Sequence, residues 1–125
     1  MSEFTELERT VLAIICDDQP GIGEALRKLL SAARISERDN TGHGFYTSFD
    51  VGKDKPPVTW PERMLDGPDG EVSVGSETLL MGFILWLEDG YPDCLEGFQY
   101  GTTAGDDIDL KVVDLTSIRW IKPLL

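Results

Sequence analysis

Residues 79–101 read LLMGFILWLEDGYPDCLEGFQYG, and this stretch decides the fold. The apolar run over 79–87 has hydrophobic side chains at both parities, which indicates a strand with both faces covered. Asp89-Gly90 predicts a hairpin turn, which Pro92 and Asp93 extend beyond two residues before a return strand. We therefore predict a central hairpin over 79–101, with strands at about 79–88 and 93–100.

The composition is that of a globular domain. A chain of 125 residues with 41% hydrophobic residues fits one domain. No apolar run is long enough to cross a bilayer, and the acidic start MSEFTE lacks the features of a secretory signal. We therefore expect a single cytoplasmic domain over 1–125, in which Cys16 and Cys94 stay reduced.

Acidic residues outnumber basic ones by 23 to 11, which gives a formal net charge of -12. Nucleic acids and anionic membranes draw affinity from clustered Lys and Arg, so both are excluded as partners. A high net charge is most simply a solubility device. It also suits an acidic face that binds a basic protein.

Two helices are predicted at the start of the chain, at about 6–17 and 22–33. Thr5 and Glu8 have the spacing of a capping box, which fixes the beginning of the first helix. Leu26, Leu29 and Leu30 give the second helix an apolar side.

Strands are predicted over the remainder of the chain. Alternating apolar and polar residues over 44–51 indicate a strand with one buried face. The other predicted strands lie at about 34–39, 71–74 and 108–121, with a candidate edge strand at 58–61. The predicted class is α+β: two N-terminal helices packed on one face of a mainly antiparallel sheet of about five to six strands.

One face of this sheet has no second layer to cover it. The strand at 79–88 presents apolar side chains on that face as well, and large exposed apolar patches usually mark association. We therefore expect a homodimer, formed through the uncovered face or through an edge strand.

Three blocks resemble a pattern found in a family of small bacterial proteins of uncharacterised activity. The blocks are TGHGFYT at 41–47, GFILWLEDG at 82–90 and LEGFQYG at 95–101. They cover roughly the middle half of the chain. The resemblance implies a shared fold and a bacterial origin, and it implies no activity.

Glu96 is the first candidate site residue. If Cys94, Phe98 and Tyr100 form the inward face of their strand, parity places Glu96 inward with them. A buried carboxylate must be paired, hydrogen-bonded or neutral. Glu96 is then a tuned acid or ligand-binding group. The alternatives are a structural carboxylate bonded to Tyr, Trp or Arg, or a strand whose other face is inward.

His43, the only histidine, lies between two glycines and is the second catalytic candidate. Catalysis would require it to meet Cys94 or Glu96 in space. One histidine and two distant cysteines exclude a standard zinc site. We predict no cofactor and no metal, although Asp106, Asp107 and Asp109 raise a calcium site as a weaker alternative to a solvated loop.

Aromatic side chains complete the candidate ligand-binding set, which consists of Glu96, Tyr46, Trp86 and Tyr100. Aromatic residues on strands also serve as core or interface. Our leading hypothesis is a non-enzymatic, acidic protein-interaction module, in one version an immunity or inhibitor-like protein that binds a basic toxin. The alternative is a small-molecule binding protein or minor enzyme with a pocket near Glu96 and His43.

Overall fold

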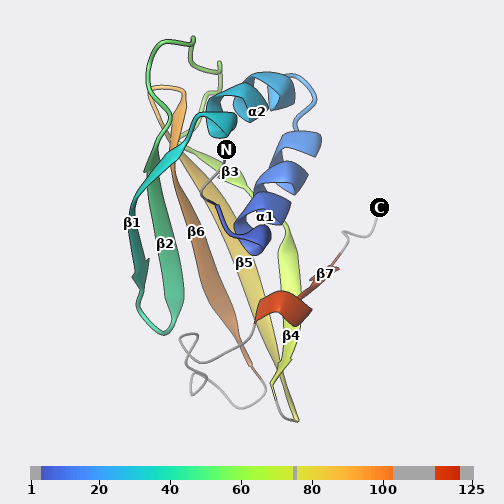
Figure 1. The fold of residues 1–125 in the computed structure, drawn as a ribbon. Helices are drawn as coiled ribbons and strands as arrows, with labels where there is room; N and C mark the ends of the chain where they lie inside the picture. Colours follow the sequence, from blue (N-terminus) through green and yellow to red (C-terminus); the bar gives the residue numbers. More distant parts are fainter. Residues whose placement is uncertain (1–3, 75, 103–114, 122–125) are drawn as a thin grey trace.

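The computed structural model describes residues 4–74, 76–102 and 115–121. Two helices, α1 (Glu6–Asp17) and α2 (Gly23–Ser31), pack on one face of a seven-stranded antiparallel sheet (Figure 1). This arrangement confirms the predicted α+β class, with more strands than the expected five to six. Within the described residues neither helix has the length and apolar character to span a bilayer.

The central hairpin organises the sheet, as predicted. β5 pairs with β6 along one side, and with β4 and β3 along the other. The strand order is β1-β2-β6-β5-β4-β7, with β3 beside β5. The strands are β1 (Arg34–Asn40), β2 (Gly44–Asp50), β3 (Met64–Asp66), β4 (Asp69–Val74), β5 (Glu77–Glu88), β6 (Tyr91–Thr102) and β7 (Arg119–Ile121).

The hairpin turn is tighter than the sequence suggests. Asp89 and Gly90 both have positive φ angles, of 53° and 82°, and Glu88 already pairs with Tyr91. The turn therefore has two residues, and the prediction that Pro92 lengthens it is wrong. Pro92 instead lies within β6, where a break in register beside Leu87 accommodates it.

Helix α1 begins where the capping box predicts. The Thr5 hydroxyl accepts from the backbone N–H of Glu8, and the Glu8 carboxylate accepts from the backbone N–H of Thr5. Helix α2 is shorter than the predicted 22–33, because Ile22 and Ala32 form its caps.

Other predicted boundaries need correction. Residues 58–61 form no strand, and the three-residue strand β3 lies just after them. The last predicted strand, 108–121, is wrong over 115–117, which form a 3-10 helix (η1, Leu115–Ser117) before β7. Its first part, 108–114, lies outside the described residues.

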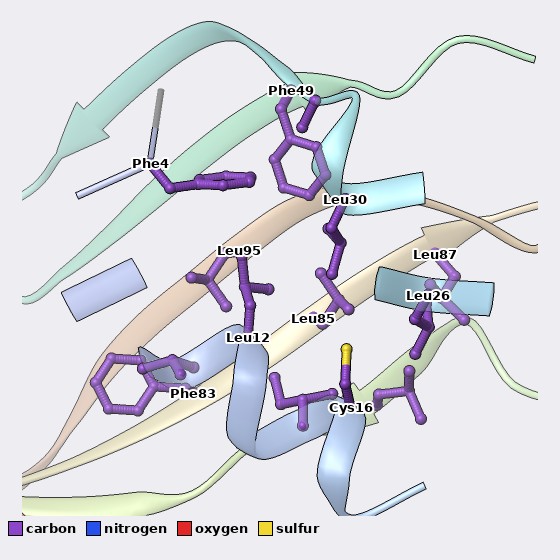
Figure 2. Packing of buried hydrophobic residues seen from close by; sticks show 14 of the residues in the cluster. Phe4, Leu12, Cys16, Leu26, Leu30, Phe49, Phe83, Leu85, Leu87 and Leu95 are labelled. Atoms are coloured by element: carbon purple, nitrogen blue, oxygen red, sulfur yellow. The ribbon is translucent and has the colours of Figure 1, made fainter. Parts of the chain in front are cut away.

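The core lies between the helices and the sheet face toward them (Figure 2). The odd-numbered side chains of β5 from Leu79 to Leu87, with Leu95 of β6, point into it and meet one side of each helix. Burying one such side chain contributes about 1.5–3 kcal/mol. The largest contributions come from the fully buried residues Val11, Ile15, Leu26, Leu29, Leu65, Leu79, Met81, Leu85 and Leu95.

Candidate functional site

The face of the sheet opposite the helices, which we call the open face, carries the even-numbered side chains of β5 and those of β6 from Cys94 to Tyr100. In the described part of the chain these side chains are only partly buried, and Tyr46 and Tyr100 are 40% and 59% exposed. The expectation that both faces of β5 are covered is therefore met on the helix side alone. The open face includes Glu37, Asp39, Tyr46, Ser48, Met64, Asp66, Asp69, Glu71, Leu80, Gly82, Ile84, Trp86, Cys94, Glu96, Phe98, Tyr100, Arg119 and Ile121.

Gly82 interrupts the apolar run of β5 because two aromatic rings from β6 lie over it. A Cβ at this position would come within 2.6 Å of the Phe98 ring and 2.9 Å of the Tyr100 hydroxyl. The two rings meet edge to face at 5.3 Å between centroids. The Tyr100 hydroxyl donates to Asp69 at 2.8 Å, and this hydrogen bond raises the pKa of Tyr100. The aromatic side chains are thus held in place while still exposed.

Glu96 lies near the middle of the open face, opposite Tyr46 on β2 and Ile84 on β5. The indole N–H of Trp86 donates to Glu96 Oε1 at 3.0 Å. The negative charge of Glu96, together with a hydrogen bond to it, raises the pKa of Tyr46. The structure therefore brings together three of the four predicted ligand-binding residues.

The position of Glu96 corrects one prediction and supports another. Leu95 and Gly97 are buried beneath the helices, so Glu96 does not point inward but lies on the opposite face. Its hydrogen bond from Trp86 is that of the structural carboxylate that we weighed as an alternative. Among the described residues, however, no Lys, Arg or His side chain lies within 4.0 Å of it.

Carboxylates also surround this aromatic centre. Strand β1 brings Glu37 and Asp39 opposite Ser48 and Tyr46, and β4 brings Asp69 and Glu71 to the other side. Arg119 of β7 pairs with Glu71. The open face therefore combines exposed aromatic rings with an acidic border.

His43 lies apart from this cluster. Its backbone carbonyl accepts from Gln99 N–H at 3.2 Å, at the end of the sheet beside the β1–β2 turn. Tyr46, which faces Glu96, follows three residues later, about 10 Å along the strand. Within the described residues no hydrogen bond joins His43 to Glu96.

The two cysteines are free and lie on opposite faces of the sheet. Cys94 is on the open face beside Ser48, further along the strand from His43 than Glu96 is. Burial raises the pKa of Cys94, against the lowering effect of the hydrogen bond from Ser48. A thiol with a raised pKa is a poor nucleophile at neutral pH.

A second carboxylate, Glu8 of α1, is buried between the helix and the sheet and is only 4% exposed. It accepts from Thr47 Oγ1 at 2.5 Å, from Arg38 Nη2 at 2.8 Å and from the Thr5 backbone N–H at 2.7 Å. Burial would raise the pKa of Glu8, but these hydrogen bonds outweigh it and lower the pKa. The network ties α1 to β1 and β2.

A pocket of about 280 Å³ opens beside this network and is lined by Glu8, Arg38, Phe45 and Thr47, among others. Donors already occupy both oxygens of Glu8, so the carboxylate has little capacity left for a ligand. We assign Glu8 a structural role.

Sequence reasoning described Glu8 only as a helix cap and missed its burial. The signal was present, because Glu8 has the helical spacing of the buried residues Val11, Leu12 and Ile15. A charged residue on the apolar side of a helix predicts a partner of opposite charge, here Arg38.

The calcium alternative, at Asp106, Asp107 and Asp109, lies outside the described residues. Within them, no group of three or more His, Cys, Asp or Glu side chains is arranged to hold a metal ion.

Comparison with known proteins gives no match to a family model, to a curated protein or to a solved structure. The resemblance to the bacterial family therefore stays a prediction from the three sequence blocks.

Proposed function

We propose that the chain is a cytoplasmic, non-enzymatic, acidic protein-interaction module that binds a basic protein through its open face. The single observation that carries the proposal is the combination of exposed aromatic side chains with an acidic border on one uncovered face. Two free cysteines suit a reducing compartment.

The two components of the open face have separate roles in such binding. Exposed Tyr and Trp residues bury a large area on association and are common binding hot spots. Carboxylates on the border, within a chain of net charge -12, attract a basic partner and speed its association. An immunity or inhibitor-like protein that captures a basic toxin is one concrete form of this function.

Self-association through the same face is the competing use of these residues. A second copy would bring an acidic border against an acidic border, which disfavours close contact. The edge strand β1 is a poor alternative interface, since it carries charged residues and a register shift between Ile35 and Glu37, both of which protect edges from pairing. A homodimer therefore stays a secondary proposal.

The enzyme or small-molecule alternative would need His43 and Glu96 to cooperate. Their separation along β2 and β6 weighs against it. We therefore favour binding over catalysis.

Native mass spectrometry on protein purified gently at low salt from its own host tests the proposal. We expect an added mass from a basic polypeptide, and this mass should be lost at high salt and in a Tyr46→Ala variant. A Glu24→Ala variant, at an exposed position of helix α2, should keep it. A mass equal to a bare dimer, or a partner kept by Tyr46→Ala, would contradict it.

A further inference from the structure

We propose that the open face selects an arginine side chain of its basic protein partner, and that this guanidinium binds Glu96 between Tyr46 and Trp86. The inference rests on the proposed function and names the group that the face recognises.

The first argument is the unused capacity of Glu96. An ionised carboxylate has about four acceptor positions. Trp86 donates one hydrogen bond to Glu96 Oε1, and Tyr46 lies opposite on β2, so most acceptor positions of the carboxylate stay open. A guanidinium can fill such positions with two parallel N–H donors.

The second argument compares Glu96 with two other carboxylates that are partly or fully buried, Glu8 of helix α1 and Glu71 of β4. Glu8 is paired with Arg38 and Glu71 with Arg119. Glu96 lies nearer the centre of the sheet and is also partly buried, yet among the described residues it has no cation within 4.0 Å. We therefore expect this central carboxylate to form an ion pair with a cationic side chain of the partner protein.

The third argument distinguishes arginine from lysine. Tyr46 is 40% exposed, and both its ring and that of Trp86 flank the carboxylate. A planar guanidinium stacks on aromatic rings while it binds a carboxylate with two donors. A lysine ammonium is a compact, strongly hydrated charge that gains less from both contacts.

The experiment uses ¹⁵N-labelled full-length protein and two neutral-capped probes, acetyl-Gly-Arg-Gly-Arg-Gly amide and its lysine analogue, which carry equal charge. The readout is the indole N–H signal of Trp86, assigned with a Trp86→Phe variant. We expect the arginine peptide to shift this signal and to bind at least about fivefold more tightly than the lysine peptide.

Glu96→Gln should weaken the arginine peptide about five- to tenfold and remove the preference over lysine. Glu37→Gln is the matched control, because it makes the same charge change on the exposed strand β1 away from the Trp86 contact, and it should keep the preference. A Tyr46→Ser variant, at an exposed position, tests the stacking contribution should Glu96→Gln not fold.

The outcomes separate this inference from the function on which it rests. Equal binding of the two peptides, or a preference that survives Glu96→Gln, overturns the arginine assignment but leaves a basic-binding open face. If neither peptide shifts any open-face signal at millimolar concentration, both the assignment and the proposed function fail.

Discussion

Glu8 and Glu96 lie on opposite faces of the same sheet, and their neighbours hold them in different ways. Glu8 is buried and receives donors from Thr5, Arg38 and Thr47. Glu96 is partly exposed and accepts a hydrogen bond from Trp86, with Tyr46 opposite it on β2 and no cation beside it among the described residues. We therefore assign Glu8, whose carboxylate is fully satisfied, to the stability of the fold, and we propose that Glu96, whose carboxylate is not, is available to bind.

The contrast between the two faces is sharpest for adjacent leucines of β5. Leu79 is 0% exposed beneath the helices, and Leu80 is 38% exposed on the open face. Leu79→Ala should lower the free energy of unfolding by about 2–5 kcal/mol, because it removes buried methyl groups and leaves a cavity. Leu80→Ala should cost about 1 kcal/mol or less. Urea denaturation of both variants measures the difference, and equal losses would show that the open face is covered.

The next largest difference is expected between Glu8 and Glu96 in their contributions to the free energy of unfolding. Glu8→Gln removes a charge from the network with Arg38 and Thr47 and should cost about 1–3 kcal/mol, a range reduced because Arg38 is 44% exposed. Glu96→Gln should cost about 0.5 kcal/mol or less. Chemical denaturation at neutral pH checks both values, and a larger loss for Glu96→Gln would reverse the assigned roles.

The same Glu8→Gln variant gives a pH dependence with a defined sign. The folded pKa of Glu8 is below its ordinary 4.5, so below that value the unfolded chain takes up the proton first. The stabilisation is therefore complete only well above pH 4.5, begins to decline at about pH 5 and is lost as pH falls through the lower folded pKa. The stability gap between wild type and Glu8→Gln should narrow from about pH 5 downward.

Subtracting the stability curve of Glu8→Gln from that of the wild type, at each pH, isolates the contribution of Glu8 from those of the other acidic groups. Asp93 acts in the opposite direction, because burial and the neighbouring Glu88 raise its pKa. A gap that is constant across the acid range would show that Glu8 is not held by its donors.

The smallest expected effect is on the titration of Tyr46. Glu96 raises the pKa of Tyr46 by its negative charge and by a hydrogen bond. NMR titration at alkaline pH should therefore show the Tyr46 pKa falling toward 10 in Glu96→Gln. Tyr100, whose pKa is raised by Asp69, is the control and should not change. An unchanged Tyr46 would place Glu96 away from the phenol.

Local sequence signals predicted much of the fold. The Thr5 and Glu8 capping box begins α1, and the apolar run with Asp89-Gly90 gives the central hairpin. Strand β3 has only three residues, too few to show a period, so it was missed. The turn was predicted too long because the register shift that accommodates Pro92 depends on the partner strand.

The sequence predicted which residues of β6 share a face with Glu96, but it did not predict which face of the sheet they lie on. Parity grouped Glu96 with Cys94, Phe98 and Tyr100, and the structure keeps that grouping. Parity cannot say which face the helices cover. Gly97 looks unsuited to a core, yet the Phe45 ring from the neighbouring strand fills its space. Only tertiary neighbours therefore reveal that Glu96 lies on the open face.

The most direct test of the open face as the interaction surface is site-specific photo-crosslinking in the native host. A benzoylphenylalanine at position 80 lies on the open face, and the same residue at position 28 lies at an exposed position of helix α2. We predict that position 80 crosslinks a basic protein in a salt-sensitive manner, and that position 28 does not. Crosslinking of the same partner from position 28 alone, or of only a second copy from position 80, would contradict the account.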